Sequence, residues 1–177
     1  MGKTDKKVPQ GQILGVSALI FVTVGTHSQG FNRLIKKMDE IAGKSTEKII
    51  MQIGSTTYKP KNAEYFEFTE NNQVIRELNR KARFIVCHGG AGTIIAALDE
   101  GTPVIAVPRR KKYHEHVNDH QLELVQALEK SGKITALYDI EKLESTLNPP
   151  VVKSKTNVTK ENGLVTALRS YVDGLVA

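Results

Sequence analysis

The sequence predicts an α/β fold in which a mostly parallel β-sheet is covered by helices on both faces. Short apolar runs rich in β-branched and aromatic residues alternate along the chain with segments whose apolar residues recur at helical spacing. Glycine or proline follows most of these runs, as is typical of the ends of strands and helices. Because strands that alternate with helices are joined by crossovers, we expect one sheet with helices on both sides.

Each expected strand is a short apolar segment that a turn residue closes. The first strand ends at Gly25, the second at Gly54 and the fifth at Pro108. In chain order the expected strands are residues 19–24, 48–53, 65–68, 84–87, 104–107 and 134–137.

Apolar residues recur every three or four positions between these strands, which predicts amphipathic helices. Gly43, Gly101 and Gly132 follow three of these segments as helix stop signals. In chain order the expected helices contain residues 31–41, 74–82, 94–98, 122–128 and 140–147.

The total length of 177 residues fits one domain. Composition further divides the chain into four parts. We expect a polar leader over residues 1–18, the α/β domain over 19–148, a linker over 149–162 and an amphipathic helix over 163–177. This last helix is expected to dock on its own sheet or on a partner.

Bulk composition narrows the classes of ligand. The formal net charge is +6, which suits anionic ligands or a position near an anionic membrane surface. Aromatic residues make up only 6% of the chain and do not interleave with basic ones, so the sequence does not indicate nucleic-acid binding. Cys87 is the one cysteine, so no internal disulfide can form and a reducing cytoplasm fits best.

The longest apolar run, residues 13–24, is shorter than the roughly 20 residues that a membrane-spanning helix needs. Lys3, Lys6 and Lys7 precede this run, so a secretory signal peptide is the alternative. However, the run continues into a strand-and-loop pattern, and no small-residue cleavage site follows. We therefore expect a cytoplasmic protein.

The strongest functional signal is the segment His88-Gly-Gly-Ala-Gly-Thr, between an expected strand and the next helix. In an open parallel sheet this position lies at the carboxyl edge, where ligands bind. Gly89, Gly90 and Gly92 let the backbone approach a ligand closely, and the helix presents unpaired amides and a positive dipole end. Thr93 can cap this helix or donate its hydroxyl to a phosphate. The loop predicts a phosphate site, and a turn whose glycines serve only tight packing is the alternative.

The segment after the fifth strand, residues 108–121, is expected on the same edge of the sheet. Four consecutive cations begin at Arg109 and would attract a pyrophosphate, with a solvated charge run as the alternative. Asp119, His120 and Gln121 are expected to point from a helix start toward the glycine loop. There they would hydrogen-bond the hydroxyls of a sugar.

Two further interpretations of this segment stay open. Asn118 and Gln121 fit a capping box for the helix that follows. His114, His116 and His120 invite a zinc site. No cysteine accompanies these histidines, and one loop rarely supplies a complete set of ligands, so we expect no metal.

The third segment, residues 24–30, follows the first strand. It is not a G-x-G-x-x-G motif, and no acid that would hold a ribose follows about 20 residues on, which weakens a dinucleotide-dehydrogenase interpretation. Gly25, Thr26 and Gly30 are expected to form a turn at the edge of the cleft, where Thr26, His27 and Gln29 would face an acceptor or a leaving group. His27 is the candidate general base, and an ordinary surface histidine is the alternative.

In this order, the motifs at 24–30, 88–93 and 108–121 resemble the C-terminal, donor-binding domain of the GT-B glycosyltransferases of family 28. More closely, the chain resembles the short catalytic subunit of two-part transferases, which act on dolichol-linked sugars or in bacterial polysaccharide synthesis. The resemblance covers about residues 19–140 and implies a Rossmann-like domain that is one half of a GT-B fold.

The resemblance implies a UDP-sugar donor, UDP-GlcNAc above all, and no cofactor or metal. The diphosphate would lie over the glycine loop. His120 and Gln121 match positions where the peptidoglycan GlcNAc transferase has paired glutamines that touch the sugar. The expected catalytic residue is His27, and the expected substrate-binding residues are Gly25, Thr26, His88, Gly89, Gly90, Gly92, Thr93, Arg109, Glu115, Asp119, His120 and Gln121.

One position departs from the family pattern. The peptidoglycan and dolichol-pathway enzymes carry a ribose-binding glutamate three residues after the Thr or Ser of the loop, where this chain has Ala96. Glu115 or Asp99 would have to substitute, although neither is aligned to that task. The departure favours the bacterial polysaccharide-type relatives.

The resemblance also implies a partner. We expect a hexosyltransferase subunit that acts with a membrane-anchored, acceptor-binding subunit and transfers the sugar, with inversion, to a lipid-linked acceptor. The chain would be cytoplasmic and peripheral at the membrane through that partner, which would carry the general base. A non-catalytic UDP-sugar-binding regulatory subunit is the main alternative. A stand-alone nucleotide-sugar epimerase would need a second Rossmann-like domain.

Overall fold

The computed structural model describes residues 18–148, which form a six-stranded, fully parallel sheet in the order β3-β2-β1-β4-β5-β6. The strands are β1 Leu19–Thr23, β2 Lys48–Gln52, β3 Glu64–Phe66, β4 Ala82–His88, β5 Val104–Val107 and β6 Thr135–Ala136. The helices are α1 Asn32–Ala42, α2 Asn72–Lys81, α3 Ala91–Asp99, α4 His120–Lys130 and α5 Leu143–Leu147, with 3-10 turns η1 Lys111–Tyr113 and η2 Ile140–Lys142.

The predicted fold class is confirmed, and every expected strand and helix forms between residues 18 and 148. The main differences lie in the two edge strands, which are shorter than expected: β3 ends at Phe66 and β6 contains only Thr135 and Ala136. Each has a single neighbouring strand, so fewer hydrogen bonds hold its ends. The expected leader, linker and C-terminal helix lie outside the described residues.

Both faces of the sheet are buried, as a parallel sheet requires. Side chains alternate along β1: Ile20 and Val22 pack into one cluster, and Leu19 and Phe21 pack into the other. Because every residue of β1 is buried, its first four residues are all apolar, without the alternation of a half-exposed strand.

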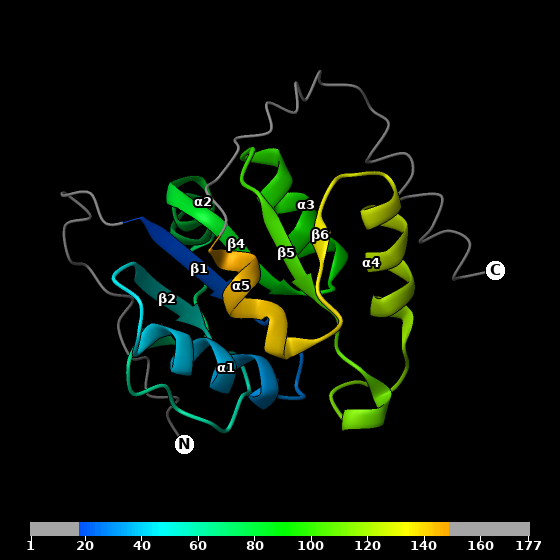
Figure 1. Ribbon diagram of the computed structural model, residues 1–177, viewed down its shortest axis with the longest axis horizontal. Helices are drawn as coiled ribbons and strands as arrows, with labels where there is room; N and C mark the ends of the chain where they lie inside the picture. Colours follow the sequence, from blue (N-terminus) through cyan, green and yellow to red (C-terminus); the bar gives the residue numbers. More distant parts are fainter. Residues whose placement is uncertain (1–17, 149–177) are drawn as a thin grey trace.

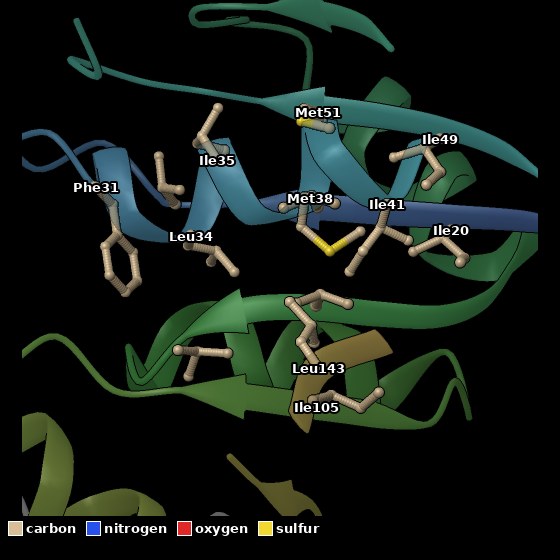
Figure 2. Packing of buried hydrophobic residues seen from close by; sticks show 14 of the residues in the cluster. Ile20, Phe31, Leu34, Ile35, Met38, Ile41, Ile49, Met51, Ile105 and Leu143 are labelled. Atoms are coloured by element: carbon tan, nitrogen blue, oxygen red, sulfur yellow. The ribbon is translucent and has the colours of Figure 1, made fainter. Parts of the chain in front are cut away.

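Helices α1 and α5 cover one face, and α2, α3 and α4 cover the other (Figure 1). Helix α1 contributes a stripe of buried residues at helical spacing, which faces the strands and α5 (Figure 2). The labelled members of this layer include Leu34, Ile35, Met38, Ile41 and Leu143. None of the helices in the described part of the chain has the length and apolarity needed to cross a lipid bilayer.

The strand order places a switch point between β1 and β4. From β1 the chain adds β2 and β3 on one side, and then returns to add β4, β5 and β6 on the other. The loops after β1 and β4 therefore leave the sheet in opposite directions. In open α/β sheets this geometry opens a crevice at the carboxyl ends of the strands.

Cys87 lies in β4 and is fully buried beside the switch point. Burial raises the pKa of its thiol to about 12. The thiol is therefore neutral and packs as a small apolar side chain.

Asp39 ties helix α1 to the loop between β2 and β3. Its side chain is buried, and its carboxylate accepts hydrogen bonds from the Lys61 and Asn62 amides and from the Tyr58 hydroxyl at 2.7 to 3.0 Å. Burial acts to raise the pKa of Asp39, but these hydrogen bonds outweigh it and hold the pKa below the ordinary value of 3.8. The carboxylate thus stays charged inside the fold because the loop satisfies it.

We expect Asp39→Ala to lower the free energy of unfolding at pH 7 by about 1–3 kcal/mol, because it leaves buried donors without an acceptor. A lowered folded pKa stabilises the protein above pH 3.8 and loses this effect as the pH falls through the folded value. The difference from the wild type should therefore shrink in acid, as measured by urea unfolding between pH 7 and pH 3. Asp99→Ala, at an exposed position, is the control; equal stability of Asp39→Ala and wild type at pH 7 would contradict the assignment.

Candidate functional site

Three loops meet at the carboxyl edge of the sheet, after neighbouring strands. They are residues 24–31 after β1, residues 89–90 after β4 and residues 108–119 after β5. We call residues 24–31 and 108–119 the rim loops. The three sequence segments predicted to share one edge therefore do so.

His88, the last residue of β4, organises the centre of this edge. Its ring is buried against Gly25 and Gly90: a Cβ built on Gly25 would lie 2.6 Å from its Cε1, and one on Gly90 would lie 2.3 Å from its Nε2. Gly25 also has a φ of +71°, which side chains rarely adopt. Both glycines are thus required by the packing of His88.

The His88 ring is neutral at pH 7. Burial, and then the charge of Arg109, lower its pKa to about 4. Its Nδ1 is buried without a hydrogen-bond partner. The other ring nitrogen, Nε2, is the one that faces Gly90 and the glycine loop.

The other two glycines of the loop differ from each other. A Cβ on Gly89 would lie 2.8 Å from Val125 Cγ2 and 3.0 Å from Gln121 Cβ, so glycine lets α4 approach the loop. A Cβ on Gly92 would meet nothing within 4 Å. Gly92 therefore faces open space in the first turn of α3.

The N-terminus of α3 has no side-chain cap. Gly90 occupies the N-cap position, and the amides of Ala91, Gly92 and Thr93 have no partner within the helix. Thr93 lies inside the first turn, so it does not cap the helix; donation of its hydroxyl to a phosphate stays a prediction. Uncapped amides and the positive end of a helix dipole favour anions in general, and His88 places a neutral ring beside this helix end.

Arg109 differs from its predicted role. Its side chain is fully buried rather than open to a pyrophosphate. Burial lowers the pKa of Arg109 to about 10, so the guanidinium stays charged at neutral pH. It donates hydrogen bonds of 2.7 to 3.1 Å to the backbone carbonyls of Val24, Gln29, Gly30 and Glu115. The two terminal nitrogens of Arg109 are therefore already hydrogen-bonded to the rim loops.

The carboxylate of Glu115 is also already bonded to protein atoms. It is buried and forms a two-point ion pair with Arg33 at 2.7 and 2.9 Å, and it accepts the Arg110 amide at 3.1 Å. Asp99 lies at the far end of α3 from the glycine loop. Neither carboxylate is placed to hold a ribose. The expectation that Glu115 or Asp99 takes over the role of the family glutamate, which is Ala96 in this chain, is therefore wrong.

His27 and His116 form an unpredicted pair across the rim loops. Their ring centroids lie 5.0 Å apart with a tilt of 37°. Burial, and then the charges of His116 and Arg109, lower the pKa of His27. The Gln29 amide donates to His27 Nδ1 at 3.1 Å. A neutral ring then carries its proton on Nε2, which suits a hydrogen-bond donor better than the predicted general base.

The start of α4 differs partly from expectation. The predicted capping box does not form: Asn118 accepts the His120 amide at 3.3 Å, and the Gln121 side chain accepts the Arg109 amide at 3.3 Å. Asp119 accepts the Lys111 amide at 3.0 Å. Gln121 does lie against the glycine loop as predicted, whereas His120 is exposed on the first turn.

Other predicted positions are open to solvent. Thr26, Lys111 and Lys112 are exposed, and Arg110 is partly buried. Across residues 18–148, no group of three or more His, Cys, Asp or Glu side chains is arranged to hold a metal ion. The cations of the 108–119 loop other than Arg109 thus remain at the surface of the rim.

We expect Gly90→Ala to lower the free energy of unfolding by about 1–3 kcal/mol, because its methyl group overlaps the His88 ring. Removing the ring in the double variant His88→Ala/Gly90→Ala should make the added cost of the alanine at 90 smaller than in wild type. Urea unfolding of the two single variants and the double variant measures this coupling. Strict additivity would contradict the packing of His88 against Gly90.

Sequence comparison finds two matches of interest. The glycosyltransferase family 28 C-terminal domain matches residues 19–171. The human UDP-N-acetylglucosamine transferase subunit ALG13 is 32% identical over 125 residues, which are 65% of this chain and 10% of that protein. The chain thus spans about a tenth of this relative's length.

Solved structures share the fold. The glycotransferase of kitacinnamycin superposes with a TM-score of 0.59 and 21% identity, over 97% of this chain and 44% of that one. The Streptomyces sp. SF2575 glycosyltransferase SsfS6, complexed with thymidine diphosphate, gives 0.57 and 14%, over 96% of this chain and 41% of that one. The architecture is that of one Rossmann-like half of a GT-B enzyme. With the family match over most of its length, this chain belongs to the glycosyltransferase family 28 C-terminal domain family.

Proposed function

We propose that this chain is the donor-binding subunit of a hexosyltransferase and that its donor is a UDP-sugar, UDP-GlcNAc above all. One observation carries the proposal: the uncapped N-terminus of α3 opens at the switch point of the sheet, beside the Nε2 side of a neutral His88 ring. Such a helix end favours a diphosphate. The glycine at 92 leaves the approach to it free of side chains.

Two relatives support the choice of donor. The human relative is named as a UDP-N-acetylglucosamine transferase subunit. A structural neighbour holds thymidine diphosphate, which is also a pyrimidine nucleoside diphosphate. Both names agree with a nucleoside diphosphate ligand, and the first agrees with UDP-GlcNAc.

The residues of the chain suit the departure of UDP. As the bond from the anomeric carbon to the diphosphate breaks, negative charge grows on the leaving oxygen. The amides of α3 and the rim cations Arg110, Lys111 and Lys112 would stabilise that charge without a metal or other cofactor. Gln121, which lies against the glycine loop, would bond a sugar hydroxyl.

The acceptor side would come from a partner. His27, the predicted base within this chain, has its Nδ1 occupied by the Gln29 amide, so we assign the general base to a second, membrane-anchored subunit. That subunit would also bind the lipid-linked sugar acceptor and hold this chain at the cytoplasmic face of the membrane. The sugar would be transferred with inversion.

Because Nδ1 of His27, the predicted base, is already hydrogen-bonded, a second candidate function is a non-catalytic UDP-sugar-binding regulatory subunit. The two functions differ in one measurement. A catalytic subunit becomes active when the membrane partner is added, and a regulatory subunit contributes binding without turnover.

A thermal-shift panel of UDP, UDP-GlcNAc, UDP-Gal, UDP-GlcA and NAD tests the donor. Ligands that bind only the folded state stabilise it by about 2.7 kcal/mol at a hundred times Kd. We expect the UDP compounds to raise the Tm, UDP-GlcNAc the most among the sugars, and NAD to have no effect. A shift with NAD alone would refute the proposal.

Gly92→Asp tests the phosphate position. The new side chain enters open space, and a carboxylate in the first turn of a helix is favourable for the dipole, so the fold should keep its stability. The same carboxylate should repel a diphosphate and weaken UDP binding by more than about tenfold. Gly92→Asn, of matched size and without charge, is the control. Calorimetry should find tighter UDP binding by Asn than by Asp; equal wild-type affinity in both variants would place the diphosphate elsewhere.

A further inference from the structure

We propose that Arg109, together with the Arg33–Glu115 ion pair, forms a loop clamp that fixes the two rim loops against each other and thereby sets the affinity for the donor. The effect on affinity rests on the proposed function. The clamp itself is a property of the unliganded fold. Its three residues act as positioning residues, because their charged groups are bound to protein atoms.

Arg109 forms the inner part of the clamp. Its Nη1 donates to the carbonyls of Gln29 and Gly30 at 2.7 and 3.0 Å and to that of Glu115 at 3.1 Å, and its Nη2 donates to the Val24 carbonyl at 3.0 Å. Three of these acceptors belong to one rim loop and the fourth belongs to the other. One fully buried side chain thus joins both loops.

Arg33 and Glu115 form the outer part. Arg33 extends from the first turn of α1 and binds both carboxylate oxygens of Glu115. Its Nη2 also reaches the Pro108 carbonyl at 3.3 Å. Glu115 in turn accepts the Arg110 amide. The 108–119 loop is therefore held at its start and in its middle.

The clamp bears on the donor site through His88 and Gly25. Arg109 holds the carbonyl of Val24, and the next residue, Gly25, packs against the His88 ring beside the α3 N-terminus. In the 108–119 loop, the Arg109 backbone amide donates a hydrogen bond to the side chain of Gln121 at the start of α4. Movement of either loop would displace groups at the proposed diphosphate and sugar positions.

A lysine cannot replace Arg109 here. A guanidinium presents five donors in a planar fork, whereas an ammonium has three donors around a point charge. An ammonium at the end of a lysine would leave at least one of the four carbonyls unpaired. Arg109→Lys therefore keeps the charge and removes the geometry, which separates positioning from electrostatics.

The first measurement needs no ligand. In the wild type, partial desolvation of the His27 ring and the charge of the neighbouring His116 hold the pKa of His27 below 6.5. If the clamp sets the spacing of the loops, Arg109→Lys should raise the His27 pKa toward 6.5, as followed by the NMR titration of its ring protons. Arg33→Gln, which leaves the buried arginine in place, should shift it in the same direction and keeps the test open if Arg109→Lys does not fold.

The second measurement is the affinity for UDP-GlcNAc by calorimetry. We expect a loss of more than about tenfold in Arg109→Lys and a smaller loss in Arg33→Gln, because small displacements of binding groups are costly. Arg83→Lys is the matched control: Arg83 also makes a two-point ion pair, with Glu47, and bonds the Leu147 carbonyl. It lies at the start of β4, on the opposite edge of the sheet.

The outcomes separate the two proposals. If the wild type does not bind UDP-GlcNAc, the proposed function is refuted. The His27 titration needs no ligand, so it still shows whether the clamp sets the spacing of the rim loops. If Arg109→Lys keeps the wild-type His27 pKa, the clamp is refuted. If the pKa moves and the affinity does not, or if Arg83→Lys loses as much affinity as Arg109→Lys, the link from the clamp to donor binding is refuted.

Discussion

The carboxyl edge of this sheet depends on a buried guanidinium whose two terminal nitrogens donate hydrogen bonds to backbone carbonyls. A buried charge is costly without hydrogen-bond partners, so Arg109 requires its four acceptors to stay in place. Because those acceptors come from two loops, neither loop can move freely. The edge is thus shaped before any ligand arrives, which lowers the ordering cost of binding.

The glycine-rich loop serves packing and ligand access at different positions. Gly90 makes room for the His88 ring and Gly89 makes room for α4, so the packing of the fold requires glycine at both positions. Gly92 has open space around it and lies in the first turn of α3. The packing interpretation of the motif therefore applies to Gly89 and Gly90, and the proposed phosphate site concerns a different glycine, Gly92.

The fold was predictable because hydrophobic periodicity records burial directly: the apolar run 19–24 gives a strand that is buried on both faces. The sharing of one edge by three loops followed from parallel topology. The burial of Arg109 was not predictable, because the next three residues are also cations, typical of a solvated surface. Its partners are backbone carbonyls, which leave no mark in the sequence.

Contacts between distant residues were hidden for a related reason. Arg33 and Glu115 are far apart in the chain, and nothing in either segment indicates that the two side chains form an ion pair. The capping-box pattern at Asn118 and Gln121 fitted the helix start, yet the Gln121 side chain bonds Arg109 instead. Local patterns predict local structure well, and they cannot show when a tertiary partner takes the same donor or acceptor.

The state of Cys87 has a practical consequence for labelling. A thiol with a pKa of about 12 and no exposed surface reacts with neither maleimides nor oxidants in the folded state. Since it is the one cysteine of the chain, a fluorophore or spin label can be attached at a single cysteine introduced at an exposed position such as Thr26. Probes of loop motion can therefore be built on the natural background, with its core packing left intact.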